Sequence, residues 1–243
     1  DIKKELLEKL DEFATYNAPI SFIGTSMVAQ SSRYRRLFLE LAQEHKVESA
    51  QKKLEALLQD QREALSTFII PKLLEKYFPG LVENLLHSNQ RSDLVTLLGE
   101  ISAAEKRFAY VGGLAEFGIH VWGDQHWKGI ERFGAKYRGT AKHFEELTKI
   151  YSSTTVNIDI GRIYQNEIIT MRVFDTLACG GCLLTEYNEN VEQYFKAGVE
   201  LETYKTLDEL RRKAFFYINN PAKASEMGKR GRERVLKDHT MAI

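Results

Sequence analysis

The feature that most constrains the fold is a regular alternation of short, β-prone apolar runs and helical patterns in the second half of the chain. Strands are predicted at 155–158, 182–185 and 199–202, with helices at 167–178 and 191–195 between them. Two further helices are predicted after the last strand, one starting with a capping box of Thr206 and Glu209, the other with a cap and a first-turn proline at Asn220-Pro221. Strands joined by helices in this way run parallel through right-handed crossovers, and helices then cover both faces of the sheet. We therefore predict an α/β fold with a Rossmann-like parallel sheet, which binds ligands at the carboxyl ends of its strands.

The first half of the chain begins with the same pattern. Residues 20–23 predict a strand that runs directly into a small-residue turn at 24–26, and helical spacing resumes over 34–41. Glycines bracket two further runs, at 119–122 and 135–137, which we interpret as short strands. The first α/β unit, over 20–41, is thus predicted to be a strand, a turn and a helix.

Between these parts, almost every residue from about 46 to 118 follows helical spacing. Pro71 and Pro79 interrupt the pattern, which indicates several helices of ordinary length instead of a coiled coil. We predict an all-helical insertion that covers one end of the sheet, with a separate recognition module as the alternative. The expected organisation is a lead-in helix at 1–17 and one domain at 18–243 that carries this insertion.

The composition excludes several classes of protein. The chain has 243 residues, 34 Lys+Arg against 34 Asp+Glu, 43% hydrophobic residues and only 2 Cys. A chain of this length can bury a large core without disulfides, and its apolar runs are too short for a membrane span. The zero net charge argues against a nucleic-acid partner. We expect a cytoplasmic protein, and because the chain starts at Asp1 instead of Met, a piece of a longer one.

Two acidic residues on the predicted helix at 167–178 suggest a ligand site. Glu167 and Asp175 are eight positions apart, which places them within about 80° around a helix and ~12 Å apart along it. Amides at the helix start, near Gln165, Asn166 and Glu167, would offer a site for a diphosphate. The alternative is that both acids are ordinary solvated residues, and spacing by itself favours this alternative.

A longer motif carries a family resemblance. Residues 172–185, RVFDTLACGGCLLT, resemble the R-x-F-E-x-x-A-C-G-x-x-L-L-T signature of the CgeB-like (spore-maturation-type) glycosyltransferases, which are bacterial. The run at 147–157 and the tail with Asn220-Pro221 and Gly228 are also similar to that family. The resemblance covers most of 119–243 and, less securely, 18–40.

The resemblance implies the C-terminal, nucleotide-sugar-binding half of a two-domain GT-B glycosyltransferase. An N-terminal domain that holds the unknown acceptor would then be missing from this chain. Related transferases carry an E-x7-E motif, which maps onto Glu167 and Asp175. By this analogy Glu167 faces the hydroxyls of the donor sugar and Asp175 binds those of the ribose. Asp is shorter than the Glu of the family pattern, so the ribose contact is in doubt.

Further donor-binding residues are predicted at strand ends. The turn after the first strand brings small donors near the phosphates, with Arg33 as a charge partner, although a plain strand-to-helix turn is about equally expected. Arg172 is predicted to neutralise the diphosphate, with an ion pair to Asp175 as the alternative. Aromatic side chains at the ends of two other strands offer a stacking surface for the base, although such residues more often belong to a core. The remaining members of the predicted set are Gly24, Thr25, Ser26, Trp122, Gly123, Tyr137, Arg138 and Asn157.

Other patterns are interpreted as structural. Cys179 and Cys182 have C-x-x-C spacing, but Cys179 ends the predicted helix, whereas redox motifs place the first thiol at a helix start. The histidines form no zinc pattern, so we expect no metal and no cofactor besides the donor substrate. The basic run at 229–237 has acidic residues interleaved, as in a solvated amphipathic helix.

Two other functions stay open. One is a catalytically silent nucleotide-binding or scaffolding module whose helical segment docks a partner. The other is a sugar-nucleotide epimerase of the same general fold, which needs titratable residues such as His120 or His126 in its cleft.

Overall fold

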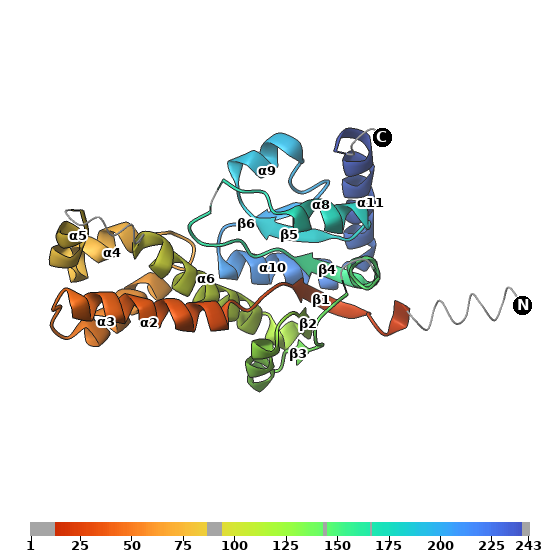
Figure 1. The fold of residues 1–243 in the computed structure, drawn as a ribbon. Coiled ribbons are helices and arrows are strands. Elements are labelled where there is room, and N and C mark those ends of the chain that lie inside the picture. Colours follow the sequence, from red (N-terminus) through yellow and green to blue (C-terminus); the bar gives the residue numbers. More distant parts are fainter. Residues whose placement is uncertain (1–12, 87–93, 143–144, 166, 240–243) are drawn as a thin grey trace, which may run out of the picture. The chain divides into compact units, whose positions relative to one another are not determined.

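The structure is a computed structural model that describes residues 13–86, 94–142, 145–165 and 167–239 (Figure 1). The chain forms two compact units. The sheet unit comprises Asp1–Thr25, Tyr110–Gly161 and Glu167–Ile243, and the helical unit comprises Ser26–Ala109 and Arg162–Asn166. Most of the lead-in helix predicted at 1–17 lies outside the described residues.

A six-stranded sheet in which all pairings are parallel forms the centre of the sheet unit. Its strand order is β3-β2-β1-β4-β5-β6, so the predicted α/β Rossmann-like fold is confirmed. Leu183 and Leu184 are adjacent in one strand, point to opposite faces and are both fully buried, so both faces of the sheet are covered there. The strands are β1 (Ala18–Ile23), β2 (Ile119–Trp122), β3 (Lys136–Tyr137), β4 (Thr154–Ile158), β5 (Leu183–Glu186) and β6 (Glu202–Tyr204).

Helices surround this sheet, and their ends follow local sequence rules (Figure 1). Thr206 caps its helix by accepting a hydrogen bond from the Glu209 amide at 3.2 Å, and Pro221 occupies the first turn of the last helix, both as predicted. The helices are α7 (Leu147–Ser153), α8 (Met171–Ala178), α9 (Glu189–Tyr194), α10 (Leu207–Ile218) and α11 (Pro221–Asp238), with 3-10 helices η1 (Ala115–Phe117) and η2 (Gln125–Phe133).

Helix α8 begins four residues later than predicted, at Met171 instead of Glu167. The carbonyl oxygens of Glu167 and Ile168 accept hydrogen bonds from side-chain amides at the start of α9, at 2.6 and 3.3 Å. The donors are Asn190 and Asn188. Because these carbonyls bind side chains that are distant in sequence, they do not accept the backbone amides of a helix, and the helix prediction for 167–170 is wrong.

The last strand is also displaced from its prediction. The sequence predicts it at 199–202, whereas β6 spans Glu202–Tyr204. Gly198 has a positive φ of 77°, and residues 198–200 form a turn closed by the hydrogen bond from the Gly198 amide to the Leu201 carbonyl. The apolar run that suggested a strand therefore belongs mainly to this turn.

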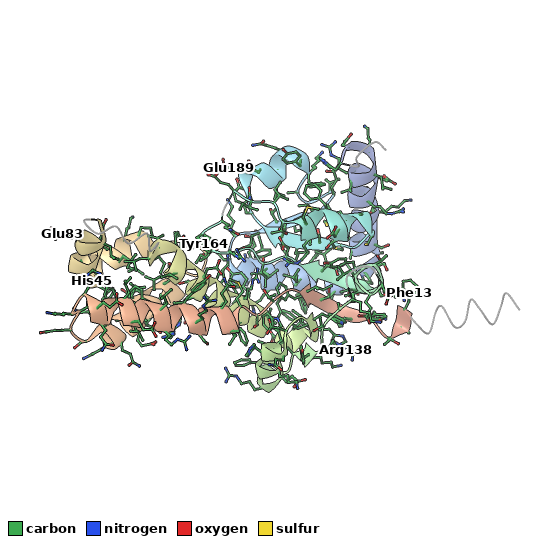
Figure 2. The ribbon with its side chains drawn as sticks, in the orientation of Figure 1. Phe13, His45, Glu83, Arg138, Tyr164 and Glu189 are labelled. Atoms are coloured by element: carbon green, nitrogen blue, oxygen red, sulfur yellow. The ribbon has the colours of Figure 1, made fainter. Side chains whose placement is uncertain are left out.

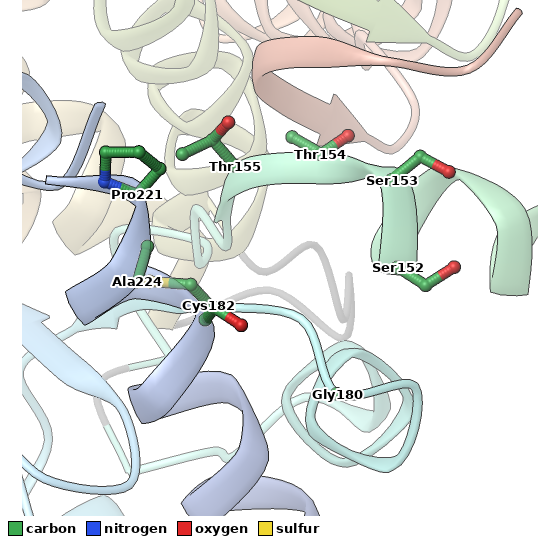
Figure 3. A pocket seen from close by; sticks show the side chains of 9 residues that line it. Ser152, Ser153, Thr154, Thr155, Gly180, Cys182, Pro221 and Ala224 are labelled. Carbon is green, nitrogen blue, oxygen red and sulfur yellow. The ribbon is translucent and has the colours of Figure 1, made fainter. Parts of the chain in front are cut away.

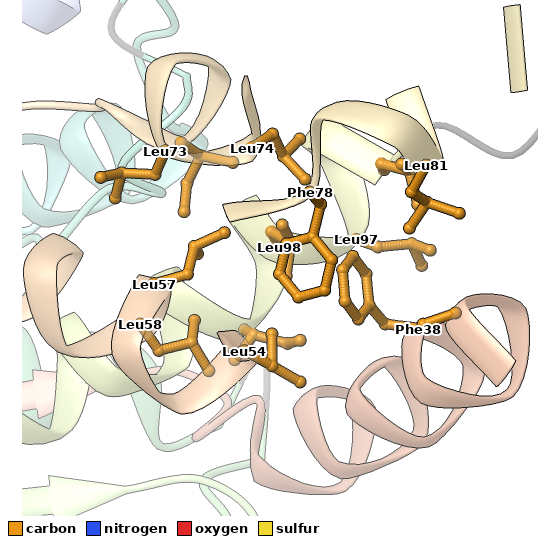
Figure 4. Packing of buried hydrophobic residues seen from close by; sticks show 14 of the residues in the cluster. Phe38, Leu54, Leu57, Leu58, Leu73, Leu74, Phe78, Leu81, Leu97 and Leu98 are labelled. Carbon is orange, nitrogen blue, oxygen red and sulfur yellow. The ribbon is translucent and has the colours of Figure 1, made fainter. Parts of the chain in front are cut away.

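The helical unit has an apolar core of its own, shown in Figure 4. Phe38 and Phe78 meet edge to face with ring centroids 5.0 Å apart, and leucines from the other helices surround them. No strand occurs among the described residues of this unit, in agreement with the helical periodicity. Its helices are α2 (Val28–Glu44), α3 (Ala50–Glu63), α4 (Ile70–Tyr77), α5 (Pro79–Leu86) and α6 (Leu94–Gly113). Residues 110–113, at the end of α6, belong to the sheet unit.

The described residues include no helix with the length and apolar character needed to cross a membrane.

Candidate functional site

The strand order places a topological switch point between β1 and β4. From β1 the sheet continues through β2 to β3 on one side, and from β4 through β5 to β6 on the other. Ligands of open parallel sheets bind outside the carboxyl ends of the strands at such a point. Gly24 follows β1 and Asp159 follows β4, so these residues begin the candidate site.

The carboxylate of Asp159 is almost fully enclosed, with a side chain that is only 5% exposed. Its Oδ1 atom pairs with Arg172 Nη1 and accepts a hydrogen bond from Thr170 Oγ1 at 3.2 Å. Its Oδ2 atom accepts from Thr185 Oγ1 at 3.0 Å. The Tyr204 hydroxyl donates to the Asp159 carbonyl at 2.6 Å, and burial raises the pKa of Tyr204 well above its ordinary value, so the phenol stays protonated. A buried charge of this kind requires such compensation.

Arg172 extends from the first turn of α8 to the end of β1. Its Nη1 atom binds Asp159, and its guanidinium carbon lies 5.5 Å from the centre of the Phe22 ring. Its Nη2 atom lies beside Gly24, where an added Cβ would be 3.1 Å away. The guanidinium therefore lies next to bare backbone at the switch point, in an arrangement that suits an anion.

The backbone at the end of β1 is closely packed against β2. A Cβ on Gly123 would lie 2.1 Å from the Gly24 carbonyl oxygen, so only glycine fits there. The same carbonyl accepts a hydrogen bond from Trp127 Nε1 at 2.8 Å, and the indole meets Phe22 edge to face at 5.6 Å. These contacts determine the position of the Gly24 backbone at the end of β1.

The two predicted carboxylates do not share a helix. Asp175 is half-buried on α8, whereas Glu167 is exposed in the segment before α8, so their expected spacing along one helix is wrong. Burial, with Asp175 and Asp159 nearby, raises the pKa of Tyr151 to about 12. Asp175 lies on α8 one turn after Arg172, and Tyr151 belongs to α7.

The diphosphate site is predicted from a helix start at 165–167, whereas α8 starts at Met171. Gln165 belongs to the helical unit, where its amide donates to the Arg162 carbonyl at 2.9 Å. Asn166 lies outside the described residues.

The aromatic residues predicted to stack on a base are engaged elsewhere. Trp122 is 3% exposed within β2, so its ring belongs to the core. The Tyr137 hydroxyl donates to the Gly123 carbonyl at 3.3 Å. Arg138, labelled in Figure 2, donates to the Thr15 carbonyl at 3.1 Å. Within the sheet unit, these side chains hold loops together and form no open aromatic surface.

Asn157 is 1% exposed, and its amide group is used inside the sheet. Its Oδ1 atom accepts from Ser21 Oγ at 2.7 Å, and its Nδ2 atom donates to the carbonyls of Tyr151 and Cys182 at 3.1 and 3.2 Å. This residue links three segments of the fold and does not face the candidate site.

The remaining predicted donor residues are divided between the units. Thr25 is exposed at the end of the sheet unit's first segment. Ser26 and Arg33 belong to the helical unit, where Ser26 Oγ accepts from the Val28 amide at 3.2 Å and Arg33 is exposed on α2. Ser26 is thus part of the α2 start.

A small cavity of about 200 Å³ occurs at the opposite end of the sheet (Figure 3). Hydroxyl side chains at the start of β4, among them Thr154 and Thr155, line this cavity together with Pro221 and Ala224 of α11. Since ligands bind at the carboxyl ends of parallel strands, this cavity is not the site suggested by the topology.

The two cysteines lie between α8 and β5. Burial raises the pKa of Cys182 to about 12 and the pKa of Cys179 above its ordinary value, so both thiols stay protonated. His120 is 8% exposed within β2. Among the described residues, no group of three His, Cys, Asp or Glu side chains has the geometry to hold a metal ion.

Sequence reasoning missed Asp159 and its partners Thr170, Thr185 and Tyr204. One signal was present, because Asp159 is the first residue after a predicted buried strand, where polar side chains reach the carboxyl edge. The partners are 11, 26 and 45 positions away and show no motif spacing.

The fold and the switch-point cluster define an α/β protein in which an enclosed Asp159–Arg172 ion pair lies at the carboxyl edge of a parallel sheet. A model of the glycosyl transferase-like family matches residues 100–242. This match covers more than half of the chain, which therefore belongs to that family.

Solved structures of TarM show a partial similarity. One TarM crystal structure is 11% identical with a TM-score of 0.46, over 56% of this chain and 29% of that chain. A point mutant of S. aureus TarM, in complex with Fondaparinux, alpha-GlcNAc-glycerol and UDP, is 8% identical with a TM-score of 0.44, over 55% and 29%. The chain thus spans less than a third of these TarM chains. No curated protein matches the sequence.

Proposed function

We propose that the sheet unit is the donor-binding part of a CgeB-like glycosyltransferase with a GT-B fold, and that it binds a nucleoside-diphosphate sugar. Membership of the glycosyl transferase-like family supports a transferase. The observation that carries the proposal is the guanidinium of Arg172 beside Gly24, at the switch point of the sheet. A cation next to bare backbone suits the two phosphates of such a donor.

The proposed chemistry is displacement at the anomeric carbon of the donor sugar. The bond from this carbon to the diphosphate oxygen breaks, a bond to an acceptor oxygen forms, and negative charge develops on the departing diphosphate. Arg172 stabilises that charge because its guanidinium is already in place. The acceptor and any catalytic base belong to an N-terminal domain that precedes this part, so no catalytic residue is assigned here.

Two carboxylates are proposed to bind hydroxyl groups of the donor. Asp175 lies one turn after Arg172 on α8, and it is proposed to accept hydrogen bonds from the ribose. Glu167 lies in the segment before α8 and is proposed to bind the sugar. The nucleotide sugar is the donor substrate, and no further cofactor is proposed.

The test is calorimetric titration of the chain with UDP, GDP, ADP and CDP, repeated on Asp175→Ala. We expect saturable binding of one nucleotide and a loss of about tenfold to a hundredfold in the variant, because a charged hydrogen-bond partner contributes about 1.5 to 3 kcal/mol. Glu233→Ala removes an exposed acid on α11 and is the matched control, with unchanged affinity expected. If none of the four diphosphates binds, a catalytically silent module becomes the better interpretation.

A further inference from the structure

We propose that Asp159 is a positioning residue that orients Arg172 toward the phosphates of the donor. This inference rests on the proposed function and adds a residue that does not itself touch the ligand. It starts from the side-chain cluster that encloses one carboxylate at the switch point of the sheet.

Both oxygens of the Asp159 carboxylate are occupied by the protein. Arg172 and Thr170 bind Oδ1, Thr185 binds Oδ2, and 5% of the side chain is exposed. The Tyr204 hydroxyl donates a hydrogen bond to the Asp159 carbonyl at 2.6 Å, which holds the backbone that carries this carboxylate. A carboxylate so enclosed does not bind a sugar or ribose hydroxyl, so its effect on a ligand passes through Arg172.

The guanidinium of Arg172 keeps unused hydrogen-bonding capacity. Nη1 donates to Asp159, and among the described residues no acceptor is hydrogen-bonded to Nη2 or Nε. The side chain is 18% exposed, and Nη2 lies beside Gly24 at the end of β1. Because the guanidinium is planar, binding Nη1 and packing against Phe22 together set the direction of the remaining N–H groups.

This arrangement reduces the cost of binding. A free arginine side chain samples many rotamers and loses that conformational entropy when it binds a phosphate. Arg172 is already restricted by its contacts with Asp159 and the Phe22 ring. Donors held in place before charge develops also need no reorganisation during the reaction. Asp159 is therefore expected to influence recognition of phosphate specifically, and not that of the base or ribose.

The experiment measures how much affinity the phosphates add. For the chain and for Asp159→Asn, calorimetry compares the nucleoside diphosphate that binds best in the panel above, its nucleoside, and inorganic pyrophosphate. Asparagine retains the shape of Asp159 but removes the charge. We expect Asp159→Asn to bind the nucleoside diphosphate and pyrophosphate at least tenfold more weakly than the unmodified chain does. Its affinity for the nucleoside is expected to stay within twofold of that of the unmodified chain.

A double-variant cycle tests whether the effect passes through Arg172. In an Arg172→Gln background, Asp159→Asn is expected to cause no further loss, because the group that it orients is already absent. Thr170→Val removes one hydrogen bond to the same carboxylate without changing its charge, so it provides a second test if Asp159→Asn does not fold. Thr170→Val is also expected to weaken diphosphate affinity, by a smaller factor than Asp159→Asn does.

Other outcomes overturn the inference. Equal losses for nucleoside and diphosphate indicate a structural role for Asp159, and additive losses in the double variant show that it acts independently of Arg172. If the unmodified chain binds no diphosphate, the proposed function fails. If it binds one but Asp159→Asn and Thr170→Val leave the phosphate contribution unchanged, only the positioning role fails.

Discussion

Two glycines determine the shape of the backbone next to the candidate site. The β1 and β2 ends are so close that the Gly24 carbonyl occupies the space where a side chain at position 123 would begin. A Cβ added to Gly24 would in turn lie 3.0 Å from Phe22 Cζ, so a side chain there requires the ring or Arg172 to move. The candidate site therefore requires glycine at positions 24 and 123, where a Cβ atom would contact neighbouring groups.

Replacing Gly123 by alanine is expected to destabilise the protein by more than about 2 kcal/mol, because the new methyl group overlaps a backbone oxygen that is held by Trp127. Denaturant titration at constant temperature measures the free energy of unfolding. Gly80→Ala is the matched control, since nothing beyond its chain neighbours and its own helix lies within 4 Å of the added Cβ, and no loss of stability is expected; a gain of up to about 1 kcal/mol is expected for alanine in α5. Equal stability of the two variants would contradict the close-packing argument.

At the scale of elements, local signals predict a helix end well when the partner group is also local. Thr206 and Glu209 are three residues apart, and the hydrogen bond between them forms as predicted. The α8 start behaves differently, because Asn190 and Asn188 bind the carbonyls of the preceding segment from another element. The position of α8 thus depends on α9, and its N-terminus lies at Met171.

Substitution of Thr206 by alanine is expected to cost about 1 kcal/mol, because the Glu209 amide loses its side-chain partner at the start of α10. The free energy of unfolding measures this loss. Thr206→Ser keeps the hydroxyl and is expected to stay within about 0.5 kcal/mol of the unchanged chain. A serine variant as unstable as the alanine variant would show that the methyl group, and not the cap, is responsible.

At the scale of the whole molecule, the described residues form two units with separate cores. The sheet unit has buried clusters around its strands, such as the one with Leu183 and Val173, and the helical unit has the cluster centred on Phe38 and Phe78. Titratable groups inside either core link stability to pH.

His120 provides such a link. Burial, with Arg138 and Lys136 nearby, lowers its pKa from 6.5 to about 4. Below pH 6.5 the unfolded chain binds a proton at His120 that the folded chain does not, so stability is fully present above 6.5 and is lost as the pH falls toward 4. The free energy of unfolding is expected to decrease by on the order of 2 kcal/mol across this range.

The check is denaturant titration at several pH values for the chain and for His120→Gln. The variant lacks the titrating group, so the part of the pH dependence between 6.5 and 4 that belongs to His120 should disappear. His126 is exposed on η2, and His126→Gln is the matched control, with the original pH dependence retained. Identical pH profiles for all three proteins would contradict this assignment.

The class of fold follows from local patterns in the sequence. Alternating periodicities placed β1, β2, β4 and β5 within a few residues, because strand and helix patterns arise from which side chains must be buried along a single segment. The same local physics predicts the Thr206 cap of α10 and Pro221 in the first turn of α11. The cap predicted at Asn220 is wrong, because its side-chain amide donates to the Phe216 carbonyl and makes no capping hydrogen bond. Local patterns did not predict the short turn before β6, since an apolar run looks the same in a turn that packs on a core as in a strand.

The candidate site, in contrast, depends on how the segments are brought together in space. Asp159, Arg172 and Gly24 come from three different segments, and their juxtaposition depends on the strand order and on Gly123, which lets two backbones meet. The sequence identified Arg172 and Gly24 through the turn and the family motif, but assigned Trp122 and Asn157 to the ligand, although both are buried in the sheet. Spacing along the chain reports which residues share an element, whereas contact across a parallel sheet depends on crossovers that bring distant positions together.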